Sequence, residues 1–126
     1  MYESSMASRK ASALAKVRKL CLSFAGATER PSHGAPTFFI GGKRAFVMFV
    51  ADHHGDGRLA LWCAAPPGAQ RMLVDSDPEI FFVPPYVGPS GWVGVRLDRG
   101  ADWSLVAGVI EHAYEARSRT GARKTR

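Results

Sequence analysis

The chain has 126 residues, a length that fits one domain and leaves no room for a catalytic domain with a separate cofactor domain. Hydrophobic residues make up 46% of it and charged residues 22%, so it can bury a core, which excludes an intrinsically disordered chain. The formal net charge is +6, but five of the 17 basic groups and none of the 11 acids lie in residues 117–126. The remainder is nearly neutral, which argues against a uniformly basic nucleic-acid-binding surface.

The order of segments predicts a flexible N-terminus over 1–8, a single folded domain over 9–116 and a basic, disordered tail over 117–126. The N-terminus lacks a charged segment followed by an apolar signal core, and the longest unbroken apolar run, residues 45–51, is far too short to span a bilayer. We therefore expect a cytoplasmic protein that does not enter a membrane, and we favour a monomer.

Apolar residues at helical spacing predict a first amphipathic helix from about Ser8 to a stop at Gly26. Its opposite face is basic, which is typical of a solvated helix face or of a surface that contacts phosphates. The apolar stripe comprises Leu14, Val17, Leu20, Cys21 and Phe24.

Three β-type runs follow the segment 28–36. The first two, 37–40 and 44–50, are joined by two glycines that suit a tight hairpin turn, and the third, 58–64, follows the turn at 52–57. Three consecutive strands joined in this way predict an antiparallel meander.

A short helix at 69–74 leads to a short strand at 80–83, which two prolines end. Residues 92–97 resume a strand with its valines on one side, and Asp102 is placed to cap a closing helix. Helices at both ends of a run of antiparallel strands predict an α+β fold, with the terminal helices packed on one face of the sheet. The closing helix has an apolar stripe of Trp103, Val106, Ala107, Ile110, Ala113 and Tyr114.

No motif implies a cofactor, and we expect no enzymatic activity. Cys21 and Cys63 lie in apolar stretches that raise a thiol pKa, so neither suits a nucleophile, although a disulfide between them stays open. The turn cluster Asp52, His53, His54 and Asp56 offers metal-ligand chemistry, but adjacent side chains at a strand end point to opposite faces. We therefore assign no metal site.

Basic residues on the hairpins could contact a phosphate backbone, while two aromatic residues could stack on bases. The alternative is an apolar groove, lined by the same aromatic residues and Trp62, that binds a protein or a small ligand. The candidate nucleic-acid-binding residues are Lys43, Arg44, Arg58, Arg96, Arg99, Tyr86 and Trp92.

Several motifs in the right order resemble the MmcQ/YjbR-like family. They are Leu22-Ser23-Phe24-Ala25-Gly26-Ala27-Thr28-Glu29, Gly34-x-Pro36-x-Phe38, Gly41-Gly42-Lys43, and Phe81-Phe82-Val83-Pro84-Pro85-Tyr86 followed by Gly91-Trp92-Val93-Gly94-Val95-Arg96-Leu97-Asp98.

The resemblance implies a two-layer sandwich of the frataxin-like (CyaY-like) group, without enzymatic activity. Its members are labelled DNA-binding from a proposed pair of β-hairpin wings, which would correspond here to residues 52–57 and 89–91. It thus implies non-specific contacts to DNA phosphates, although Ala64 stands where close members tend to carry a lysine. The similarity to frataxins also implies iron binding as an alternative. Frataxins, however, bind iron through an acidic first helix, whereas the first helix of this chain is basic.

Overall fold

The computed structural model describes residues 2–124, and it describes the side chains of residues 7–118. A six-stranded antiparallel sheet has the order β1-β2-β3-β4-β6-β5. The strands are β1 (Ala27–Ser32), β2 (Ala35–Ile40), β3 (Arg44–Ala51), β4 (Leu59–Cys63), β5 (Phe81–Phe82) and β6 (Val93–Arg96). The helices are α1 (Tyr2–Leu22), α2 (Ala69–Ser76) and α3 (Trp103–Lys124), with short 3-10 turns at His53–Gly55 and Gly88–Ser90.

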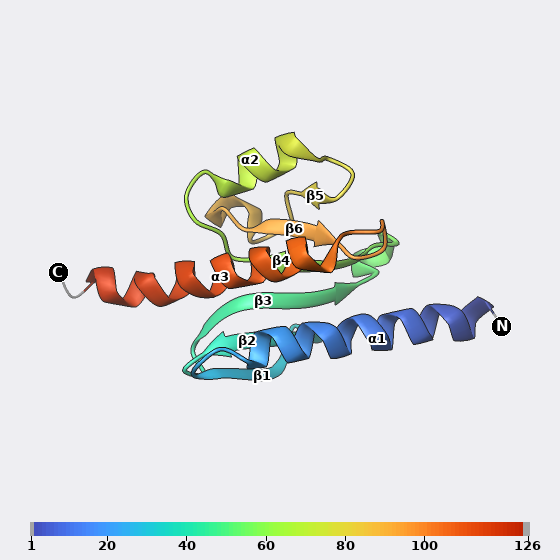
Figure 1. Ribbon diagram of the computed structural model, residues 1–126, viewed down its shortest axis with the longest axis horizontal. Coiled ribbons are helices and arrows are strands. Elements are labelled where there is room, and N and C mark those ends of the chain that lie inside the picture. The colour runs from blue at the N-terminus through green and yellow to red at the C-terminus, as the bar shows by residue number, and fades with distance from the viewer. Residues whose placement is uncertain (1, 125–126) are drawn as a thin grey trace.

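The two long helices, α1 and α3, run across the same face of the sheet, while α2 lies beside β5 and β6 at its end (Figure 1). The helices contribute Val17, Cys21, Val106 and Ile110, all fully buried. They pack on the row Val47, Cys63 and Val93 and on the row Phe49, Leu61, Val95 and Phe81, whose members are paired across neighbouring strands. This face holds the main core, and the predicted α+β architecture is confirmed.

The predicted meander is present as β2, β3 and β4, and glycines at positive φ form the first turn, with φ of 61° at Gly41 and 73° at Gly42. Asp102 caps α3 as predicted, because its Oδ1 accepts a hydrogen bond from the backbone N–H of Ser104 at 2.9 Å. The valines of β6 point into the core, also as predicted.

One strand was not predicted. β1 pairs with β2 along its whole length, although its sequence, Ala-Thr-Glu-Arg-Pro-Ser, has no apolar alternation. It is an edge strand, and an edge strand tolerates Pro31 because only one side of it must supply ladder hydrogen bonds.

Both terminal helices are longer than the sequence predicted. α1 begins at Tyr2 instead of near Ser8, and α3 continues through residues 117–124, where we expected a tail. Arg117 explains part of this extension, since its Nε donates a hydrogen bond to the carbonyl oxygen of Ala45 at 2.9 Å and holds this turn of α3 against β3. Residues 1, 125 and 126 lie outside the described residues. No helix in the described part of the chain is long and apolar enough to cross a membrane.

Candidate ligand-binding cavity

The face of the sheet opposite α1 and α3 has no helix layer. Thr37, Met48, Trp62 and Gly94 form one row across it, because each is paired with the next on neighbouring strands. The segment from Val83 to Trp92 folds over the middle of this row. Between them lies a cavity of about 690 Å³, a size typical of small-ligand sites.

The lining of this cavity is aromatic and without formal charge. Trp62 and Trp92 are almost fully buried, at 5% and 8% exposed, whereas Tyr86 at the mouth is 72% exposed. The described residues that line it are Ser32, His33, Ala35, Thr37, Ala45, Met48, Val50, His53, His54, Trp62, Tyr86, Val87 and Trp92, and none of these is Lys, Arg, Asp or Glu. We call this site the aromatic cavity.

Tyr86 owes its position to a tight turn. The N–H of Val87 donates to the carbonyl oxygen of Pro85 at 2.6 Å, and Tyr86 between them has φ of 65°. This hydrogen bond and a positive φ are typical of the strained form of a γ-turn. Gln70 of α2 anchors the following residues, since its Nε2 donates to the carbonyl oxygens of Gly88 at 2.9 Å and Trp92 at 2.6 Å. The segment is therefore held over the sheet.

The β3–β4 turn supplies two of the three histidines of the aromatic cavity. Asp52 and His54 have φ of 53° and 50°, and this local backbone brings the rings of His53 and His54 to 4.1 Å between centroids. The sequence argument that these neighbours would point apart was therefore wrong, because it assumed a regular strand end. Asp52 and Asp56 hold the turn, with their Oδ1 atoms accepting hydrogen bonds from the N–H groups of Gly57 and Arg58.

His53 is the polar group most enclosed by this aromatic cluster. Its ring lies edge-on to Trp62 at 5.0 Å and to Tyr86 at 5.7 Å, and its Nε2 is buried without a hydrogen-bond partner. The hydroxyl of Tyr86 lies 3.4 Å from Nε2 of His54, which joins the turn to the Tyr86 segment. A buried imidazole nitrogen without a partner loses hydration energy, so it favours a ligand that supplies a polar atom.

Backbone strain also concentrates here. The described non-glycine residues with positive φ are His33, Asp52, His54 and Tyr86. Three of them line the aromatic cavity, and Asp52 adjoins His53. Such conformations cost about 1–3 kcal/mol each and cluster at ligand-binding sites.

The described residues contain no group of three or more His, Cys, Asp and Glu that could hold a metal ion. Cys21 and Cys63 are free thiols in the core, and burial raises the pKa of both well above its usual range. Neither thiol lines the aromatic cavity.

Of the predicted site residues, Tyr86 and Trp92 meet at the aromatic cavity, but the predicted cations are dispersed. Lys43 and Arg44 lie at one end of β3, whereas Arg58 follows the turn at its other end. The guanidinium of Arg58 lies over the ring of Phe82 at 4.2 Å.

Arg96 and Arg99 form ion pairs. Arg96 pairs with Asp98 at 3.0 Å, and Arg99 pairs with Glu79 at 3.4 Å. Burial tends to raise the pKa of Asp98, but the hydrogen bonds and positive charge of Arg96, together with backbone hydrogen bonds, outweigh it and hold the pKa below its usual range. The segment implied as a second wing lies in the long connection between the antiparallel strands β5 and β6, and it contains the 3-10 turn Gly88–Ser90.

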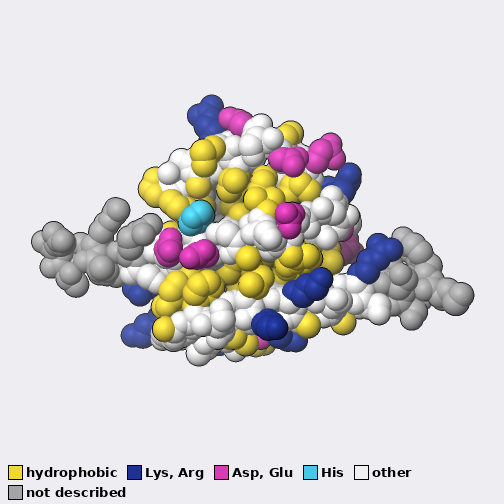
Figure 2. Space-filling model, viewed as in Figure 1, with side chains coloured by type: hydrophobic (Ala, Val, Ile, Leu, Met, Phe, Trp, Pro, Cys, Tyr) yellow, Lys and Arg dark blue, Asp and Glu magenta, His cyan; other side chains and the backbone are white. Residues whose placement is uncertain are grey.

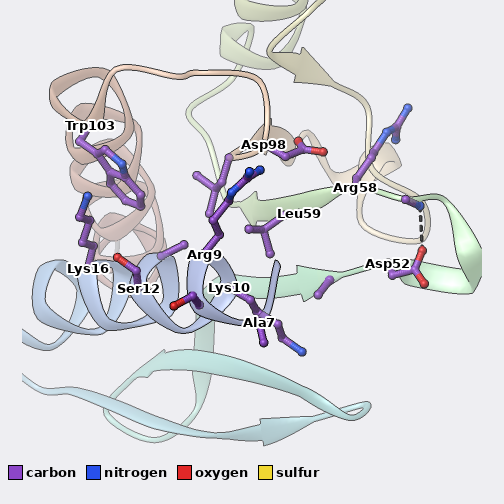
Figure 3. A pocket seen from close by; sticks show the side chains of 15 residues that line it. Ala7, Arg9, Lys10, Ser12, Lys16, Asp52, Arg58, Leu59, Asp98 and Trp103 are labelled. Carbon is purple, nitrogen blue, oxygen red and sulfur yellow. Dashed lines mark hydrogen bonds between the residues drawn. The ribbon is translucent and has the colours of Figure 1, made fainter. Parts of the chain in front are cut away.

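The basic face of α1 borders a separate groove of about 770 Å³ on the helix side of the molecule. Figure 3 shows Arg9 reaching from α1 toward the loop that carries Asp98, and Lys16 lying beside Trp103 of α3. In the face viewed in Figure 2, Lys and Arg side chains stand at separate points, some of them over α1, with hydrophobic side chains between the helices. Among the described residues, the cations visible on this face therefore form no continuous basic patch.

Sequence reasoning missed His53, His54, Met48 and Thr37 as cavity residues. The signal for the histidines was present in the turn sequence Asp-His-His-Gly, but periodicity does not predict left-handed backbone at non-glycine residues. For Met48 and Thr37, the sequence does not indicate which sheet face the helices leave open.

Comparison with known proteins gives two matches. A family model described as YjbR matches residues 22–116, which run from the end of α1 into α3. Among solved structures, the chain is similar to the crystal structure of the Deinococcus radiodurans protein DR2400, whose family-model domain is DUF419. That similarity has a TM-score of 0.65 and 20% identity, over 78% of this chain and 72% of that one. No curated protein matches.

Proposed function

The chain belongs to the YjbR family, and we propose that it is a binding module, without catalysis, for a flat, uncharged and largely apolar small ligand that enters the aromatic cavity. The observation that carries this proposal is the cavity of about 690 Å³ whose lining combines three aromatic residues and three histidines without one formally charged side chain. A charged ligand group would lose hydration there without an opposite charge to compensate it.

The position of each polar group supports a ligand with an aromatic ring and a single hydrogen-bonding atom. Trp62 and Trp92 form walls for stacking or edge contacts, and Tyr86 covers the mouth. His53 offers Nε2, which is without a partner in the aromatic cluster. A protein partner is a poorer fit, because a stable protein interface needs about 800 Å² on each side rather than a cavity of this size.

Nucleic-acid binding through hairpin cations has less support. Two of the five predicted cations pair with acids, one lies over a phenylalanine ring, and the other two lie at the far end of β3. A phosphate backbone needs several free cations along one track. Cytoplasmic localisation and a monomeric state stay expectations of the sequence.

A neutral fluorescent probe, N-phenyl-1-naphthylamine, tests the proposal. We expect its fluorescence to rise on binding, and we expect Tyr86→Ala to weaken binding by about tenfold, because loss of an aromatic contact removes about 1.4 kcal/mol. Met72→Ala is the matched control, since Met72 is an exposed apolar residue of α2 outside the cavity. Absence of probe binding, or equal binding by the Tyr86 and Met72 variants, would contradict the proposal.

Duplex DNA provides the competing test. If hairpin cations bind DNA, fluorescence anisotropy at about 50 mM salt should detect binding that falls steeply with added salt. A triple alanine variant of Lys43, Arg44 and Arg58 should then lose it. If the aromatic cavity is the binding site, we expect this triple variant to bind the naphthylamine probe as the wild type does.

A further inference from the structure

A second site, independent of the aromatic cavity, lies where α3 meets the start of β3. Arg44 is the first residue of β3, and the Nε of Arg117 donates to the carbonyl oxygen of the next residue, Ala45, at 2.9 Å. This hydrogen bond uses the Nε of Arg117, and the terminal nitrogens of its guanidinium have no hydrogen-bond partner among the described residues. Arg44 of β3 and Arg117 of α3, which are distant in sequence, are thereby brought to one corner of the molecule.

The two arginines lack a counter-charge in the described structure. Burial lowers the pKa of Arg117, and the positive charge of Arg44 lowers it further. The Nε of Arg44 is itself buried without an acceptor. Ion pairs among the described side chains join Arg18 to Glu29, Arg96 to Asp98 and Arg99 to Glu79, so none of them neutralises this corner.

Two further cations surround the same turn. Lys43 is exposed beside Arg44, and a terminal nitrogen of Arg30 donates to the carbonyl oxygen of Gly42 at 2.9 Å. Arg30 also lies over the ring of Phe39 at 3.8 Å, which fixes its position. We call Arg30, Lys43, Arg44 and Arg117 the cationic corner.

We propose that the cationic corner is an oxyanion site in which Arg44 and Arg117 bind a phosphate group. Two neighbouring guanidiniums repel each other, and partial burial weakens the screening of that repulsion by water. A tetrahedral dianion offers several acceptor oxygens and can accept hydrogen bonds from both side chains at once. Lys43 and Arg30 add long-range attraction, which favours a doubly charged group over a singly charged carboxylate.

Thermal unfolding in sodium phosphate, compared with sodium chloride of equal ionic strength, tests this site. Phosphate at about ten times its dissociation constant should raise the Tm of the wild type by about 4 °C relative to chloride. Arg44→Gln should abolish this increment, and its Tm in chloride should equal or exceed that of the wild type because the repulsion is removed. A purely structural role for Arg44 would instead lower the Tm in both salts.

Arg9→Gln is the matched control, because it removes one positive charge from an exposed position on α1 that borders the other end of β3. It should keep the phosphate increment. If Arg117→Gln does not fold, Arg117→Lys replaces it and should lose most of the increment, because a lysine offers no planar pair of donors. Equal responses of the wild type to phosphate and chloride, or an increment retained in Arg44→Gln, would overturn the site.

A second arm identifies the source of the phosphate group. A labelled single-stranded oligonucleotide is titrated against the same variants. Binding of inorganic phosphate alone assigns the site to a free phosphate or a phosphate monoester, which carry the double charge that the site favours. Tighter, Arg44-dependent binding of the oligonucleotide, whose phosphodiesters each carry a single charge, would overturn that preference. Both outcomes leave binding of the naphthylamine probe unchanged, so failure of this site and failure of the aromatic cavity are distinguishable.

Discussion

Tyr86 shows how a single residue can be held in an unfavourable conformation for the sake of its side chain. Its φ is 65°, and its ring is 72% exposed, so the ring contributes little buried area to the fold. A left-handed conformation costs a non-glycine residue about 1–2 kcal/mol. The protein therefore gains little in stability from a tyrosine here, which is what one expects of a residue that serves binding.

Replacing Tyr86 by glycine separates these two roles. Tyr86→Gly should be more stable than Tyr86→Ala by about 0.5–1 kcal/mol, since glycine adopts positive φ without steric cost and alanine does not. Urea denaturation of the two variants measures the difference. Both should bind the naphthylamine probe equally weakly. Equal stability of the two variants would mean that the turn is not strained.

Position 94 requires glycine because there is no space for a side chain, and not because of its backbone φ angle. A Cβ at this position would lie 2.3 Å from Cζ of Phe82, whose ring covers the glycine. The guanidinium of Arg58 lies over the same ring, so glycine, ring and cation are stacked at the β5 side of the open sheet face.

Gly94→Ala should therefore destabilise the protein by about 1–3 kcal/mol, the usual cost of overpacking. The double variant Gly94→Ala with Phe82→Ala gives the control, because the added methyl group then meets no ring. Denaturation of the single and double variants should show that the two costs are not additive. Additive costs would exclude the steric explanation.

Among the elements, the strands of the core could be predicted and the edge could not. β3, β4 and β6 carry apolar residues on the helix side, where Val47, Leu61 and Val95 are fully buried, so their apolar runs are visible in the sequence. β1 carries no such signal because its side chains are half-buried or exposed, and it is held by backbone pairing with β2. Pairing of this kind depends on the partner strand and not on local sequence.

The candidate site was predictable only in part, because it also depends on contacts between segments that are distant in sequence. Tyr86 and Trp92 stood out as aromatic residues in a proline-rich and glycine-rich segment, and they do line the aromatic cavity. The separation of Arg44 and Arg58 by the length of β3 was implicit in the predicted meander, whereas the ion pairs of Arg96 and Arg99 depend on the folded structure. The corner formed by Arg44 and Arg117 required knowledge that α3 continues over the start of β3.

The whole molecule has two faces of different character. Helices α1 and α3 cover one face of the sheet and enclose the main core, as Figure 1 shows. The other face carries aromatic side chains under a single connecting segment, and this arrangement leaves the aromatic cavity. A fold with one closed and one open face can keep its stability in the first and its binding in the second.

The closed face predicts the behaviour of the thiols. Cys21 and Cys63 are fully buried, and burial raises the pKa of each thiol, so little reactive thiolate is present. The native protein should react with a thiol-specific disulfide reagent only at the rate of its unfolding. Two thiols should then be titrated in denaturant. Rapid reaction of either thiol under native conditions would show that the helix layer opens.

The three tryptophans allow the most direct test of the aromatic cavity, because Trp62 and Trp92 line it whereas Trp103 lies in the groove on the helix side. Their indole N–H signals can be followed by nitrogen-15 NMR during a titration with N-phenyl-1-naphthylamine, with assignment by single Trp→Phe variants. We expect the signals of Trp62 and Trp92 to shift together and saturably while that of Trp103 stays in place. A shift confined to Trp103, or no shift of any indole signal, would contradict the account.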